Sequence, residues 1–142
     1  MNVAQVLKDK GRSVVIDRAD TTIGDIVRDL ARERIGAIVI VERDNRVIGI
    51  VSERDVMQAI ATMGAACLDR PVSEIMTRNV VTCVEQDTLN DLMGKMTEGR
   101  FRHIPVVDDE RIVGIVSIGD VVKHHIAEVE MEAHALKSYV AG

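Results

Sequence analysis

The sequence contains almost no aromatic residues. Among 142 residues there are one Tyr, one Phe and no Trp, so aromatic residues make up 1% of the chain. Proteins that bind single-stranded nucleic acid stack bases on aromatic rings, and this scarcity disfavours that class. The hydrophobic residues, 46% of the chain, are therefore mainly Val, Ile, Leu, Met and Ala, and we expect an aliphatic core.

Basic residues, cysteines and long apolar runs are also scarce. The 18 Lys and Arg residues are outnumbered by 23 Asp and Glu, and the net charge of -5 argues against a nucleic-acid partner. No apolar run reaches the roughly 20 residues of a membrane span, and residues 1–5 lack signal-peptide features, so we expect no membrane association. Cys67 and Cys83 form no Cys-x-x-Cys motif. They favour a reducing cytoplasm, with a single disulfide as the alternative.

The chain instead contains two copies of one unit. The segment 47–56 (VIGIVSERDV) recurs at 112–121 as IVGIVSIGDV, an offset of 65 (112 − 47). Residues 22–26 match 88–92 at an offset of 66 (88 − 22). Since neither copy is long enough to bury a good core alone, we expect the two to pack on each other.

The starts of the two copies correspond as well, because residues 3–8 match 72–77. This pattern predicts a first repeat at 2–61, a connector at 62–71, a second repeat at 72–127 and a helical tail at 128–142.

Each copy predicts a short strand, a helix, two strands and a final helix, which is an α/β class of fold. Apolar residues at i, i+3, i+4 and i+7 predict the first helix of each copy, and Ser52 and Ser117 open the last. Continuous apolar runs predict two hairpins whose sheets are covered on both faces. The predicted strands are 14–16, 37–41, 47–51, 80–82, 104–107 and 112–116.

The last helix runs on past the repeat. Its apolar residues are spaced 4, 3, 4, 3 and 4 apart, a seam of little more than two heptads. This seam either packs on its own domain or contacts a second chain. Its residues are Val122, Ile126, Val129, Ala133, Leu136 and Val140.

The repeated motif Gly-Ile-Val-Ser-x-x-Asp ends in Asp55 in the first copy and Asp120 in the second. Ser-x-x-Asp at a helix start is a capping box, and capping is the simpler interpretation of either copy alone. The same position exposes free amides that favour a phosphate, and a carboxylate there can accept hydrogen bonds from a ribose diol.

Two copies of Gly-Ile-Val-Ser-x-x-Asp-Val, each preceded by a segment such as Ser73-Glu74-Ile75-Met76-Thr77, resemble a tandem pair of CBS domains over residues 2–127. The resemblance implies two βαββα units packed through their sheets with pseudo-twofold symmetry. It also implies clefts for adenosine-containing ligands, a regulatory role and no catalytic machinery.

The resemblance implies specific contacts to a nucleotide. Asp55 and Asp120 match the ribose-binding acids, and Ser52 and Ser117 match the hydroxyls before them. Arg102 and His103 match a position whose basic side chains reach phosphate. The base would lie between aliphatic walls rather than on an aromatic ring, against Val81, Thr82, Ile104 and Pro105 in the second copy and Ile16 in the first.

Arg54 lies at the helix start beside Asp55, where the second copy has Gly119. A guanidinium at this point can bind phosphate with two hydrogen bonds. The alternative is a surface residue paired with Glu53 or Asp55.

We therefore predict a non-enzymatic regulatory module that binds an adenine nucleotide as a cytoplasmic homodimer. AMP is the first candidate, with ADP, ATP or NAD(H) as alternatives. The competing hypothesis is a structural dimer without nucleotide, whose C-terminal helix recruits a client protein. We expect no metal, because His124 with Glu128, and His134 with Glu130, form pairs without further ligands.

Overall fold

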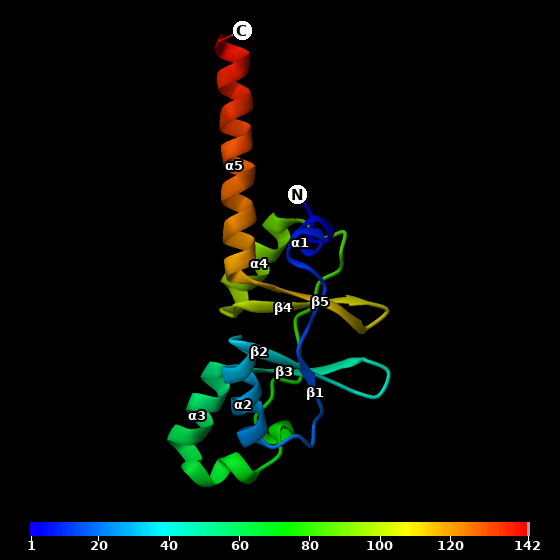
Figure 1. Ribbon diagram of the computed structural model, residues 1–142, viewed down its shortest axis with the longest axis vertical. Helices are drawn as coiled ribbons and strands as arrows, with labels where there is room; N and C mark the ends of the chain where they lie inside the picture. Colours follow the sequence, from blue (N-terminus) through cyan, green and yellow to red (C-terminus); the bar gives the residue numbers. More distant parts are fainter. Residues whose placement is uncertain (142) are drawn as a thin grey trace.

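The computed structural model describes residues 1–141 as an α/β pair of two small sheets, from which a long C-terminal helix projects (Figure 1). The first half contains α1 (Val3–Lys10), β1 (Ile16–Asp17), α2 (Ile23–Glu33), β2 (Ala37–Val41), β3 (Val47–Ser52) and α3 (Glu53–Met63). Two short 3-10 helices follow, η1 (Ala65–Asp69) and η2 (Val72–Glu74). The second half contains α4 (Leu89–Gly99), β4 (His103–Asp108), β5 (Arg111–Ser117) and α5 (Ile118–Ala141).

Both predicted hairpins are present. β2 pairs with β3, and β4 pairs with β5, in each case antiparallel. β1 adds to the first sheet, parallel to β2, so that the strand order is β1-β2-β3. Every residue of β2 is buried, as its continuous apolar run predicts for a strand covered on both faces.

The predicted short strand at 80–82 is wrong. Only Cys83 bridges to Val106, through bonds from the Cys83 amide to the Pro105 carbonyl and from the Val107 amide to the Cys83 carbonyl. Extending this parallel ladder toward Val81 needs an amide hydrogen at position 105, and proline has none. The first repeat has Val39 there, and β1 forms, two residues later than its predicted start at 14.

Each repeat lends its first segment to the core of the other. Val3, Val6 and Leu7 of α1 are buried with residues of α4, β4 and β5 in the second repeat. Val72 and Met76, which open the second repeat in the sequence, are buried in the core of the first. Figure 1 shows α1 beside β5, in the half of the molecule opposite β1.

Reciprocal backbone bonds join the two hairpins. The Val47 amide donates to the Glu110 carbonyl at 3.1 Å, and the Ile112 amide donates to the Asn45 carbonyl at 2.9 Å. The two bonds are equivalent by the repeat: with the offset of 65, Val47 corresponds to Ile112 (47 + 65 = 112) and Asn45 corresponds to Glu110 (45 + 65 = 110). These matched contacts give the pair its pseudo-twofold arrangement.

α5 continues past the second repeat as one helix of 24 residues, which confirms the predicted continuation. Only Val121 and His124 in it are buried, whereas Val122, Ile126 and Val129 are about half exposed. The seam is therefore not covered by its own domain. None of the helices described for residues 1–141 combines the length and apolar character needed to cross a membrane.

Candidate functional site

A cavity of about 610 Å³ lies between the two repeats beside the start of α3. It is bounded by the start of β2, the end of β3, the segment before Cys83 and the turn between α4 and β4. Six of the residues predicted from the sequence line it, namely Ser52, Arg54, Asp55, Val81, Arg102 and His103.

Asp55 is held at this cavity by the capping box at the start of α3. Its Oδ2 accepts hydrogen bonds from the Ser52 amide (2.9 Å) and the Ser52 hydroxyl (3.1 Å), and its own amide donates to Ser52 Oγ (3.2 Å). The capping interpretation is therefore confirmed. It does not compete with ligand binding, because Oδ1 receives no bond from any residue within 1–141.

Three arginines line the cavity without a carboxylate partner. In the part of the chain that the structure describes, no Asp or Glu oxygen lies within 4.0 Å of the guanidinium nitrogens of Arg54, Arg100 or Arg102. Arg54 thus does not form the ion pair that was the alternative. Unpaired guanidiniums around a cavity favour an anionic ligand, for which phosphate is the best geometric match.

His103 contributes a neutral ring rather than the expected cation. Burial, reinforced by the charge on Lys10, lowers the pKa of His103 below its ordinary value of 6.5, although Glu53 and Asp120 oppose the shift. The ring is therefore mainly uncharged at pH 7 and can exchange neutral hydrogen bonds with a ligand.

The other predicted residues lie away from this cavity. Asp120 and Ser117 form the same capping box at the start of α5, and Lys10 binds Asp120 at 2.6 Å. Ile104 is completely buried in the second core, so it offers no surface to a ligand in this structure. Pro105 is buried too. Ile16 and Thr82 do not line the cavity either.

Several lining residues were not predicted, notably Arg100, Phe101, Thr77 and Asn79. Arg100 is the left-handed residue that ends α4, so its place depends on how the helix terminates. The single Phe of the chain, Phe101, also lines the cavity, beside aliphatic residues such as Val81. The ring of Phe101 fills the space that a side chain on Gly99 would need, so glycine at position 99 is what admits the ring.

The remaining candidate groups form no reactive site. Across residues 1–141, no three His, Cys, Asp or Glu side chains are placed to hold a metal ion. The His124 ring, one of the candidate ligands, has its Nε2 atom 3.3 Å from Asp9 Oδ2. Cys67 and Cys83 are both buried and free, and burial, with Asp87, raises the pKa of Cys83 to about 12, which leaves it an unreactive thiol.

Similar proteins cover nearly the whole chain. A mitochondrial CBS domain-containing protein of Arabidopsis thaliana is 32% identical over 99% of this chain and 72% of its own length. The crystal structure of a CBS-domain containing protein from Agrobacterium tumefaciens is 46% identical, with a TM-score of 0.85 over 88% of this chain and 99% of that one.

Two related structures were solved with adenosine derivatives. A CBS domain protein from Pyrobaculum aerophilum complexed with AMP is 30% identical, with a TM-score of 0.76 over 84% of this chain and 89% of that one. The CBS domain pair of protein MJ0100, in complex with 5-methylthioadenosine and S-adenosyl-L-methionine, is 26% identical, with a TM-score of 0.80 over 90% and 98%.

The family model for the CBS domain matches this chain twice, at residues 5–62 and 72–126. Both matches include a Ser-x-x-Asp capping box, and together they contain every residue that lines the cavity. The chain therefore belongs to the CBS domain family, a non-catalytic family, and is a tandem CBS pair.

Proposed function

We propose that this protein is a regulatory module that binds an adenine nucleotide in the cavity at Asp55. The observation that carries the proposal is the combination of an acid with a free oxygen and three unpaired arginines around one cavity of about 610 Å³. A drug-sized ligand occupies a pocket of this size.

In this proposal each part of the nucleotide has a chemical partner. Asp55 Oδ1 accepts hydrogen bonds from the ribose diol, and Arg54, Arg100 and Arg102 neutralise the phosphates. The base lies against Val81, Ile50 and Phe101, which supply apolar surface. AMP remains the first candidate, supported by the AMP complex of a 30% identical relative. ADP, ATP and NAD(H) remain alternatives, because three arginines can accept more than one phosphate.

Binding would act by shifting an equilibrium between arrangements of the two repeats, or of two chains. A ligand that contacts both repeats biases such an equilibrium only by its difference in affinity for the two arrangements. The cavity fits this requirement, since Asp55 and Arg54 come from the first repeat and Arg100 and Arg102 from the second. Two buried, unlinked thiols agree with the cytoplasmic location that we retain in the proposal.

Isothermal titration with AMP, ADP, ATP and NADH tests the proposal. At least one should bind, and Asp55→Ala should weaken it by about 10- to 100-fold, because a hydrogen bond to a charged group is lost. Asp120→Ala is the matched control: it removes the equivalent acid outside the cavity and should leave this affinity unchanged. Saturation by none of the four nucleotides would reject the proposal in favour of a structural, client-docking dimer.

A further inference from the structure

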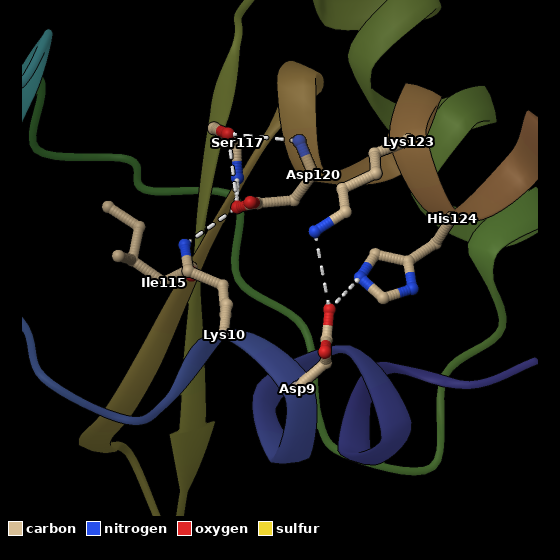
Figure 2. A network of polar contacts seen from close by, with 7 residues as sticks. All are labelled: Asp9, Lys10, Ile115, Ser117, Asp120, Lys123 and His124. Atoms are coloured by element: carbon tan, nitrogen blue, oxygen red, sulfur yellow. Dashed lines mark hydrogen bonds and ion pairs between the residues drawn. The ribbon is translucent and has the colours of Figure 1, made fainter.

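The acid equivalent to Asp55 in the second repeat is already bound by a cation of the same chain. Lys10, the last residue of α1, donates from Nζ to Asp120 Oδ2 at 2.6 Å and to the Ile115 carbonyl at 2.9 Å (Figure 2). Asp120 Oδ2 also accepts from the Ser117 amide (2.9 Å) and hydroxyl (3.0 Å). Asp55 receives the equivalent two bonds from Ser52, so what distinguishes Asp120 is the bond from the Lys10 cation.

The position of Lys10 is equivalent to that of Asn79 in the first cavity. Residues 3–8 match 72–77 at an offset of 69, which places Lys10 opposite Asn79 (10 + 69 = 79). The packing confirms the alignment: Leu7 fills the space beside Gly114, and Met76 fills the space beside Gly49. Asn79 lines the open cavity at Asp55, whereas Lys10 bonds to Asp120.

The two positions differ because the leading segments fold differently. η2 ends at Glu74, so Thr77 is extended and exchanges backbone bonds with Ile50, at 2.9 and 3.0 Å. α1 instead stays helical to Lys10 and is capped by Gly11, whose amide donates to the Leu7 carbonyl at 2.7 Å. The Ile115 carbonyl, equivalent to that of Ile50, therefore accepts the Lys10 ammonium instead of a backbone amide.

Neighbouring contacts hold the end of α1 in this position. Asp9, next to Lys10, lies 3.5 Å from Lys123 Nζ and 3.3 Å from His124 Nε2 on α5 (Figure 2). Although partial burial opposes it, the hydrogen bonds from Lys10 and Ser117 lower the pKa of Asp120, so this carboxyl group is ionised at neutral pH. The second repeat also has Gly119 in place of Arg54 and so lacks that phosphate-binding cation.

We propose that Lys10 is an internal occupant of the second nucleotide position, so that each chain binds one nucleotide, at Asp55. The lysine replaces a ligand in two respects: it bonds to the carboxylate of Asp120, and it neutralises the charge that would attract a diol. This inference rests on the proposed function, since it concerns how many of its two equivalent positions accept a nucleotide.

Titration calorimetry of the full chain tests the inference by stoichiometry. The probe is whichever of AMP, ADP, ATP and NADH binds the wild-type protein most tightly. The wild type should bind one nucleotide per chain. Lys10→Asn, which copies Asn79 of the open cavity, should bind two, and adding Asp120→Ala to it should return the stoichiometry to one.

Two further variants serve as controls for the effect of Lys10→Asn. Lys10→Ala provides a second way of removing the ammonium and should also bind two nucleotides. Lys8→Asn removes the same charge from an exposed position of α1 and should keep a stoichiometry of one. Two nucleotides on the wild type, or one on both Lys10 variants, would overturn the inference. Absence of binding to the wild type would instead reject the proposed function.

Discussion

Asp17 in β1 is a carboxylic acid whose surroundings disfavour the ionised form. Its Oδ2 is buried without a hydrogen-bond partner, and Asp29 of α2 lies beside it. Burial, the neighbouring carboxyl group of Asp29 and the negative charge of Asp25 together raise the pKa of Asp17 to about 7, against an opposing effect of Arg32.

The stability of the protein should therefore depend on the protonation of Asp17. Because the folded-state pKa lies above the unfolded value of 3.8, the stabilising contribution is complete below pH 3.8 and is lost as the pH rises to about 7. Asp17→Asn keeps an uncharged group and should raise the melting temperature at pH 8 by about 3–6 °C, after allowing for solvent screening of this partly exposed group.

Thermal melts at pH 4.5 and pH 8 measure this effect. The gain from Asp17→Asn should shrink markedly at pH 4.5, where the wild-type acid is protonated in the folded state. Asp20→Asn, at an exposed position of the same segment, should change neither melt appreciably. An equal gain at both pH values would contradict the assignment to Asp17 ionisation.

At the scale of elements, α1 and η2 show how one repeated segment acquires two roles. Leu7 of α1 packs against Gly114, and Met76, two residues after η2, packs against Gly49; in each case the glycine belongs to the other repeat. A Cβ on Gly114 would lie 2.8 Å from Leu7 Cδ2, so the close approach of α1 to β5 requires glycine there. α1 alone extends to a charged end, and that end reaches Asp120.

Leu7→Ala should destabilise the whole protein although Leu7 lies far in sequence from the core that it fills. The side chain is 1% exposed in the second core, and removing it leaves a cavity. Urea denaturation should show the free energy of unfolding falling by about 2–5 kcal/mol. Lys8→Ala, on the exposed face of the same helix, should change it by less than about 0.5 kcal/mol. A cost for Leu7→Ala as small as that of Lys8→Ala would show that α1 does not dock in solution.

At the scale of the whole molecule, apolar surface remains on the helices after the two repeats have packed. Met57, Ile60 and Met63 are exposed on α3, as are Val122 and Ile126 on α5. Figure 1 shows α5 projecting far beyond the sheets, where within residues 1–141 nothing covers its outer part. Exposed apolar side chains repeated along one face of a helix are typical of interaction surfaces, and we propose a homodimer that buries them.

Light scattering at micromolar concentration should give the mass of a dimer. The Ile126→Lys variant should have the mass of a monomer, because the substitution places an unpaired charge in the proposed interface. Met131→Lys introduces the same charge on the exposed face of α5 opposite the seam and should preserve the dimer. A monomeric wild type, or a dimer insensitive to Ile126→Lys, would leave the apolar seam to a client protein instead.

The repeat made much of the fold predictable from the sequence. The two hairpins, the helices opened by Thr22 and Thr88, and the continuous α5 all follow from local periodicity and capping. Six of the twelve predicted nucleotide contacts line one cavity: three belong to the local motif at 52–55, and the family resemblance supplied the other three, Val81, Arg102 and His103. The strand at 80–82 failed because Pro105, distant in sequence, cannot donate to it.

The tertiary structure alone decided that one of the two equivalent acids bonds to a lysine of the chain. Asp55 and Asp120 stand in the same motif and form the same capping box, although the residue before them is Arg54 in the first copy and Gly119 in the second. Lys10 is 110 residues from Asp120, and only the exchange of leading segments between repeats brings them together. The sequence by itself determined two helix starts with the same Ser-x-x-Asp motif; long-range packing determined that only Asp120 bonds to a cation of the chain, because Lys10 from a distant helix reaches one acid and not the other.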